Sequence, residues 1–154
     1  MPSIGKQYFN SPSHLDPYPN LKPEDLEEEM KLAKKLGVTP AQAGTAEFEE
    51  ILQQDEGQVK WVITKNGELW FIPKNVNGNE IAHTVMTNGD GVIMAGDANI
   101  VQWESELGYP YTVLELTNQS GHYQPISDRL EMAKIIFEAN NITVPDGSIQ
   151  PYIP

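Results

Sequence analysis

The sequence predicts an α+β fold, in which an antiparallel sheet of about five to six strands is packed by N-terminal helices and one C-terminal helix. Helix-forming patterns come first and last along the chain, and the segment between them is rich in β-forming runs. This order favours an antiparallel sheet, because parallel strands would alternate with helices. Within the middle segment, Asn66-Gly67 stands between two β-rich runs, which is a strong signal for a hairpin.

The helices are predicted from apolar side chains at helical spacing and from residues that favour helix ends. In residues 23–36, Leu26, Met30 and Ala33 form one apolar stripe. Acidic residues in the first turn and lysines in the last turn match the helix dipole. Further helices are predicted to start at Thr39-Pro40, to span about 45–54 and to run from 128 to about 140.

Strands are predicted where β-branched and aromatic residues cluster. A polar loop is predicted over 74–80, and the pattern in 81–86 favours no single structure. The predicted strands are 59–64, 68–72, 92–95, 97–101 and 111–117.

The length of 154 residues suits one domain. Residues 24–143 carry the helix and strand signals and form the predicted α+β domain. Residues 1–23 are dense in proline, which opposes regular structure, so we expect an irregular arm there. Residues 144–154 are also proline-rich and are expected to form an extended tail.

The charge of the chain excludes several kinds of partner. Its 22 acidic and 10 basic residues give a net charge of -12, which repels phosphate backbones and anionic lipids. We therefore expect neither direct nucleic-acid binding nor membrane docking, whereas a basic protein would be attracted. The acidic run 24–29 is expected to be a solvated helix face, with a surface for such a basic partner as the alternative.

Cysteine is absent, which excludes disulfides, thiolate zinc sites and cysteine nucleophiles. No run of 18 apolar residues predicts a membrane span, and the first residues lack the apolar region of a signal peptide. We expect a soluble protein, either cytoplasmic or delivered without such a peptide. The composition does not decide between these compartments.

The stretch 120–125, Ser-Gly-His-Tyr-Gln-Pro, is the strongest candidate for a functional site, because it crowds polar and aromatic groups at the end of a predicted strand. His122 and His83 carry imidazoles that titrate near neutral pH. Asp97 could orient one of them or act as a base. We predict catalytic roles for His83, His122 and Asp97, and substrate-binding roles for Thr84, Ser120, Gly121 and Tyr123.

Each of these residues also fits a structural role. His83 fits a buried histidine bonded to a backbone carbonyl, and Asp97 fits a turn residue. Ser120 and His122 fit a tight turn in which they bond their own backbone. Gly121 would then supply a positive φ. His14, in the proline-rich arm, is expected to be solvated.

No metal site is predicted. His83, Asp97 and His122 are residue types of a facial iron triad, but their spacing matches no metal motif. Residues 88–91, Asn-Gly-Asp-Gly, lack the twelve-residue ligand pattern of a calcium loop and predict a turn. The chain also lacks the sequence signatures of a P-loop, a dinucleotide-binding turn and a nucleophile elbow.

Two motifs taken together resemble a known family. Residues 83–97 resemble the pattern H-S-S-F-L-x-G-G-x-V-x-A-A-G-E, and residues 120–125 resemble S-G-H-Y-x-P. Val85 stands at the second serine and Asp97 at the glutamate. This set of motifs is similar to a domain of plant IQ-motif calmodulin-binding proteins and of bacterial toxin-like or effector-like proteins. The resemblance covers about residues 58–143, and no IQ motif accompanies it.

The resemblance implies a shared fold and a shared pocket. It favours a toxin-like or effector-like domain whose histidine-based pocket performs group transfer or hydrolysis on a nucleotide-type substrate. ADP-ribosyl transfer from NAD is the leading hypothesis, with Glu115 and Glu131 as candidates for a catalytic glutamate by proximity alone. The alternative is a non-catalytic acidic domain that binds a basic protein, such as an immunity or anti-defence protein.

Overall fold

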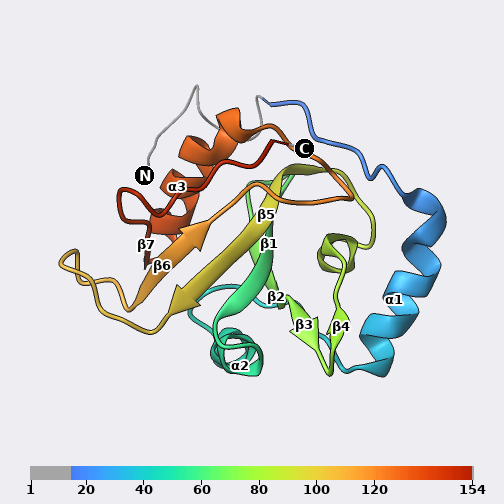
Figure 1. Cartoon of the computed structure of the whole chain (residues 1–154), viewed down its shortest axis with the longest axis horizontal. Helices are drawn as coiled ribbons and strands as arrows, with labels where there is room; N and C mark the ends of the chain where they lie inside the picture. Colours follow the sequence, from blue (N-terminus) through green and yellow to red (C-terminus); the bar gives the residue numbers. More distant parts are fainter. Residues whose placement is uncertain (1–14, 154) are drawn as a thin grey trace.

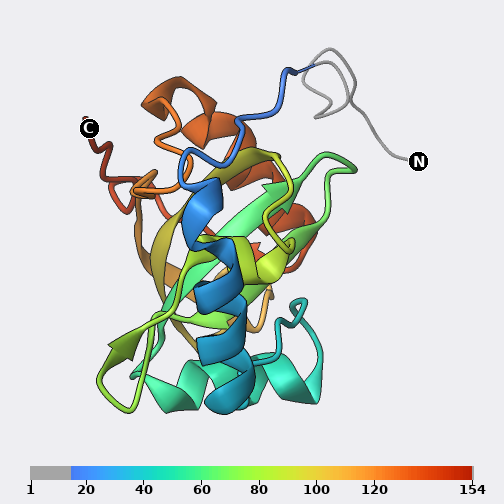
Figure 2. The same cartoon turned by 90° about the vertical axis from the view of Figure 1, so that its right-hand side faces the viewer.

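The computed structural model describes residues 15–153, and Figures 1 and 2 show it from two sides. Its centre is a five-stranded sheet with the order β2-β1-β5-β6-β7, and a two-stranded sheet pairs β3 with β4. This architecture confirms the predicted α+β class. The strands are β1 (Gln58–Thr64), β2 (Leu69–Pro73), β3 (Asn75–Val76), β4 (Asn79–Glu80), β5 (Val92–Val101), β6 (Tyr111–Leu116) and β7 (Ile142–Thr143).

Three α-helices and three short 3-10 helices accompany the sheet in the described part of the chain. The C-terminal helix follows the sheet strands β1, β2, β5 and β6, as the sequence predicts, and precedes β7. The helices are α1 (Leu26–Lys35), α2 (Ala46–Gln54) and α3 (Leu130–Ala139), and the 3-10 helices are η2 (Pro23–Asp25), η3 (His83–Met86) and η4 (Ser127–Arg129).

Side chains along β1 alternate between the two faces of the sheet, and each face has its own hydrophobic core. Trp61 and Ile63 point to a core that they share with α2 and α3, where the Trp61 and Phe137 rings meet edge to face with centroids 5.2 Å apart. Val62 points to a smaller core with Ala33 of α1 and with η3. Helix α1 therefore lies over the opposite face of the sheet from α2 and α3. Figure 2 shows α1 in front of the strands and α3 behind them.

Four details differ from the prediction. The predicted polar loop 74–80 instead contains β3 and β4, which pair with each other. Residues 92–95 and 97–101 form one continuous strand, β5, and the last strand pair, β6 with β7, is parallel. The expected short helix after Thr39-Pro40 is wrong. Ala41 instead forms two backbone hydrogen bonds with Phe71, of 3.0 and 2.9 Å, which bury Ala41 against the edge of the sheet.

The described part of the N-terminal arm, residues 15–22, lies along the domain. Tyr18 pairs with Val92 of β5, and the Leu21 amide donates to the carbonyl of His122 (2.7 Å). Arg129 fastens this arm, because its Nη1 donates to the carbonyls of Asp16 (2.9 Å) and Ile93 (2.8 Å). Its guanidinium also lies 4.5 Å from the centre of the Tyr18 ring. His14 lies outside the described residues.

Gly96 allows the chain after β6 to cross β5 closely. A Cβ at this position would lie 1.8 Å from the carbonyl oxygen of Thr117 and 2.9 Å from the Trp61 ring. The Thr117 amide donates to the Asp97 carbonyl at the same crossing (2.9 Å). The crossing leads directly into residues 120–125, so Gly96 helps to place that loop.

We expect Gly96→Ala to lower the free energy of unfolding by at least about 3 kcal/mol, because two backbone segments would have to separate to admit the methyl group. Urea denaturation measures this loss. Gly121→Ala is the matched control, since its new Cβ would meet only the tip of Lys22, at 3.5 Å, and its φ is not left-handed. Equal stability of the two variants would contradict the close crossing.

Candidate functional site

A polar cleft opens between α1, β4, the central sheet and residues 119–122. It consists of two adjoining hollows, of about 380 and 230 Å³, which share Lys60, Glu80 and Gly121. The larger hollow is of the size of small-ligand pockets, which is roughly 300–1,000 Å³. The charged and imidazole side chains of the polar cleft are Lys22, Glu29, Lys60, Lys74, Glu80, His83, Asp97 and His122.

Glu29 of α1 joins two of the predicted site residues. Thr84 Oγ1 donates to Glu29 Oε1 (2.7 Å), and His122 Nε2 forms a short hydrogen bond with Glu29 Oε2. Both the histidine and the glutamate side chain are about five-sixths buried, with 15% and 16% exposed. The carboxylate thereby fixes the His122 ring at the wall of the larger hollow.

Sequence reasoning placed Glu29 in a solvated acidic run and so missed it. The signal was present, because Leu26, Glu29, Met30 and Ala33 follow the i, i+3, i+4, i+7 spacing of one helix face. Glu29 is thus the single acidic residue of α1 on the inward stripe. The exposed neighbours Glu27 and Glu28 point to solvent and pair only with Lys31.

His83 has the contacts of a framework residue. Its ring is buried, and Nε2 donates to the Gly96 carbonyl (2.8 Å). Burial lowers the pKa of His83 from 6.5 to about 3, and the nearby Lys60 acts in the same direction. His83 is therefore neutral at physiological pH. It lines the smaller hollow whereas His122 lines the larger one, so the two rings do not meet at one point.

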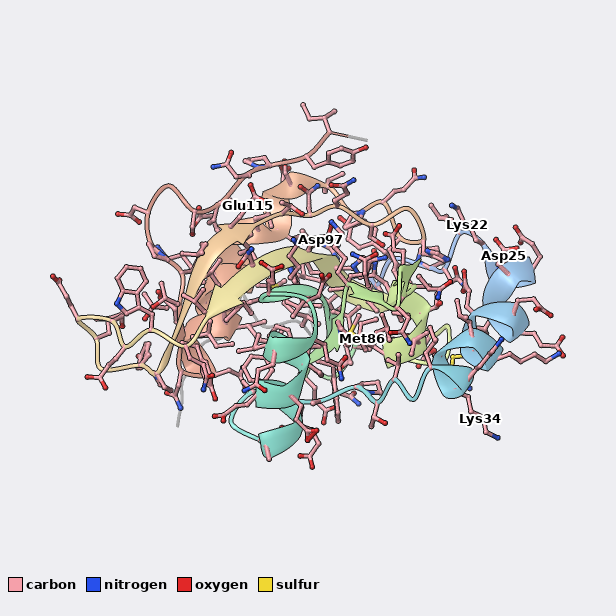
Figure 3. The ribbon with its side chains drawn as sticks, turned by 60° about the horizontal axis from the view of Figure 1, so that its bottom comes forward. Lys22, Asp25, Lys34, Met86, Asp97 and Glu115 are labelled. Atoms are coloured by element: carbon pink, nitrogen blue, oxygen red, sulfur yellow. The ribbon has the colours of Figure 1, made fainter. Side chains whose placement is uncertain are left out.

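Asp97 lies on β5 (Figure 3) and lines the smaller hollow. Its Oδ2 lies 3.3 Å from Lys74 Nζ, while the buried Oδ1 has no hydrogen-bond partner among the described residues. The distance from Oδ1 to His83 Nε2, 4.0 Å, is too long for a hydrogen bond. Burial raises the pKa of Asp97, with the nearby lysines acting in the opposite direction. A carboxyl group with a raised pKa in a hollow is suited to proton transfer.

Lysines from three separate segments point into the polar cleft. Lys60 is buried, and its Nζ lies 2.8 Å from Glu80 Oε2, an ion pair that lowers the pKa of Glu80. Lys74 pairs with Asp97. Lys22 precedes α1, near Gly121, and forms no ion pair with a described residue (Figure 3). The three lysines are matched in number by the carboxylates of Glu29, Glu80 and Asp97, so the cleft is close to neutral within an acidic protein.

The loop 120–125 is held from within by its own hydrogen bonds. Ser120 Oγ accepts from the Tyr123 amide (3.3 Å), and the Ser120 carbonyl accepts from the Gln124 amide (2.8 Å). The left-handed residue is Gln124, at φ 45°, and not Gly121 as the sequence suggested. Gly121 is exposed and lines both hollows, which leaves it available to contact a ligand.

Tyr123 belongs to the core instead of the cleft surface. Its ring is 1% exposed, and its hydroxyl donates to the Asp90 carbonyl (2.7 Å). Tyr123 therefore offers no surface to a ligand in the cleft, contrary to the substrate-binding role predicted for it. Ser120 is likewise buried, at the edge of the smaller hollow. Glu115 and Glu131 are exposed and line neither hollow.

Within residues 15–153, no three His, Cys, Asp or Glu side chains are grouped in a way that would hold a metal ion. None of the helices in that range has the length and apolar character needed to cross a membrane.

The buried His83 predicts a dependence of stability on pH. The folded protein keeps His83 neutral down to about pH 3, whereas the histidine takes up a proton near pH 6.5 in the unfolded chain. The stability that depends on the neutral ring is therefore complete above pH 6.5 and is lost as the pH falls. Between about pH 5.5 and 4.5 the free energy of unfolding should fall by about 1.4 kcal/mol per pH unit from His83 alone. Asp97 acts in the opposite direction near pH 4. Because its pKa is raised in the folded state, the folded protein binds a proton there more readily than the unfolded chain does, which stabilises the fold as the pH falls.

Urea denaturation at several pH values measures the slope for the wild type and for His83→Gln, whose amide can still donate to Gly96. We expect a shallower slope in the variant. In the wild type, the His83 ring resonances should not titrate above about pH 4.5 in NMR spectra. A His83 resonance that titrates near pH 6.5 would contradict a buried neutral ring.

Comparisons with protein-family models, with curated proteins and with solved structures found no match to this chain. The family resemblance of the two motifs therefore stays a prediction, and the function has to be argued from the geometry of the polar cleft.

Proposed function

We propose that the protein performs group transfer or hydrolysis on a nucleotide-type substrate bound in the polar cleft, with His122 as the general base. The observation that carries this proposal is the Glu29–His122 pair at the wall of a hollow of about 380 Å³. A carboxylate that holds an imidazole fixes its orientation and stabilises its protonated form, which is how such pairs support proton transfer.

The hydrogen-bonding pattern assigns the nitrogen that would act. Nε2 of His122 is engaged with Glu29, so Nδ1 is the nitrogen left to accept a proton from water or an acceptor hydroxyl. With NAD as the substrate, that oxygen would add to the ribose carbon while the bond to nicotinamide breaks. His122 would then carry the proton taken from that oxygen, and the Glu29 carboxylate would face the resulting imidazolium.

The lysines support the substrate class. Lys22, Lys60 and Lys74 line the two hollows, and cations are the usual partners of phosphate groups. Lys60 and Lys74 pair with Glu80 and Asp97, so Lys22 is the cation that pairs with no carboxylate among the described residues. The exposed Gly121 lies where both hollows meet, so a phosphate can approach the backbone there. Asp97 lines the smaller hollow beside Lys74, where its carboxyl group would act in proton transfer.

The test is turnover of NAD, followed by nicotinamide release in NMR spectra, with ATP as a second nucleotide. We expect His122→Asn to lower turnover by at least about 100-fold, which is the range for loss of a general base. Glu29→Gln should lower turnover by about 10-fold or more, since the amide keeps the Thr84 contact but loses the charge that faces the imidazole.

Glu28→Gln is the matched control, because Glu28 is a neighbouring acid on α1 that is exposed and outside the cleft. It should retain full turnover. Melting temperatures of all variants separate loss of chemistry from loss of folding. Wild-type protein that neither binds nor turns over either nucleotide, or an active and folded His122→Asn variant, would overturn the proposal.

A further inference from the structure

The loop after β5 and the segment after β7 lie at the other end of the molecule from α1 (Figure 1). A second concave surface lies between them and shares no residue with the polar cleft. It is a groove of about 560 Å³ between the loop 103–106, the strand β6 and the segment 143–148. We call it the β6 groove. Its apolar lining includes Trp103, Leu114 and Pro145, above the buried Val113.

The β6 groove exists because the C-terminal segment leaves the edge of the sheet and returns to it. Strand β7 pairs with β6 at Tyr111 and Thr112, and the chain pairs again only where Ile149 meets Leu116. Between these points, the chain turns away at Pro145 and Gly147, which has φ 88°. The detour leaves the middle of β6 as the floor of the groove.

Hydrogen bonds fix the wall that carries Trp103. Thr112 Oγ1 donates to the Trp103 carbonyl (2.7 Å), and Thr143 Oγ1 donates to Ser105 Oγ (2.6 Å). The loop is therefore tied both to β6 and to β7. A binding surface held in this way loses little conformational entropy when a partner docks.

Large apolar side chains are exposed at the β6 groove although the protein has a well-filled core. Trp103 is 65% exposed, Leu107 on the same loop 61% and Leu114 on β6 50%. An exposed tryptophan next to exposed leucines on a fixed loop is the composition of an interaction site, since tryptophan is the residue most enriched among binding hot spots.

The charge around the β6 groove selects the kind of partner. Glu104, Glu106 and Asp146 line it, and no lysine or arginine does. Lys134 pairs with Asp146 at the rim (3.3 Å), which leaves the carboxylates of the tryptophan-bearing loop without a cation among the described residues. The face of an indole also attracts cations. A second copy of this chain, with its net charge of -12, would be repelled.

We infer that the β6 groove binds a lysine- or arginine-rich segment of another protein that inserts an apolar side chain beside Trp103. The carboxylates of Glu104 and Glu106 contact the cations of that segment, and Trp103 and Leu114 contact its apolar side chain. This role is independent of the chemistry in the polar cleft.

The test uses an immobilised array of peptides with lysine and arginine around one variable apolar position, and an array in which glutamate replaces every cation. Peptides from the basic array should bind the full-length protein, most tightly where the apolar residue is aromatic or leucine. Trp103→Ala should weaken this binding by at least 10-fold. Glu104→Gln with Glu106→Gln should weaken it and also reduce its dependence on salt.

Glu27→Gln with Glu28→Gln is the matched control, because it removes the same charge from exposed positions on α1. This variant should bind the basic peptides as the wild type does. The inference is overturned if neither array binds, if the acidic peptides bind equally well, or if the α1 variant loses as much binding as the groove variant. It is also overturned if sedimentation shows a dimer that Trp103→Ala dissociates, since a second copy would then occupy the groove.

Discussion

The carboxylate of Glu29 joins three parts of the chain, namely α1, η3 and the loop that follows β6. Helix α1 has only one buried residue, Ala33, so burial alone attaches it weakly to the sheet. Glu29 adds a hydrogen bond to Thr84 of η3 and another to His122 of the loop that follows β6. Because both contacts are largely shielded from water, they contribute more than an exposed ion pair would. The larger hollow of the polar cleft keeps its shape as long as this carboxylate is in place.

Charge is distributed unevenly over this acidic protein. The buried Lys60 and the half-buried Lys74 are kept inside by Glu80 and Asp97, which compensate their charge. The carboxylates of Glu27, Glu28, Glu104 and Glu106 instead face solvent. The positive charges of the cleft are thus matched by carboxylates, whereas the carboxylates of the β6 groove loop have no lysine or arginine beside them among the groove residues.

Much of the fold could be predicted because its signals are local. The hairpin at Asn66-Gly67, strands β5 and β6 and helix α3 each follow from a few neighbouring residues. The pairing of Ala41 with Phe71 and the parallel pairing of β7 depend on contacts between distant segments, which no local pattern encodes. In the polar cleft, the sequence pointed to the loop 120–125, and burial decides which of its residues line the cleft. Tyr123 and His83 are drawn into the core, while the inward face of α1 brings Glu29 to His122.

The arm before α1 limits how far the protein can be shortened from its N-terminus. Tyr18 covers the end of β5, the Leu21 amide bonds to the His122 carbonyl, and Lys22 lines the larger hollow. Arg129 is the only arginine in the chain, and it is used to hold this arm. A shortened protein that starts at residue 24 would uncover a strand edge able to pair with other chains. It would also lack one wall of the cleft, so the shortest fragment suitable for activity measurements starts before residue 16.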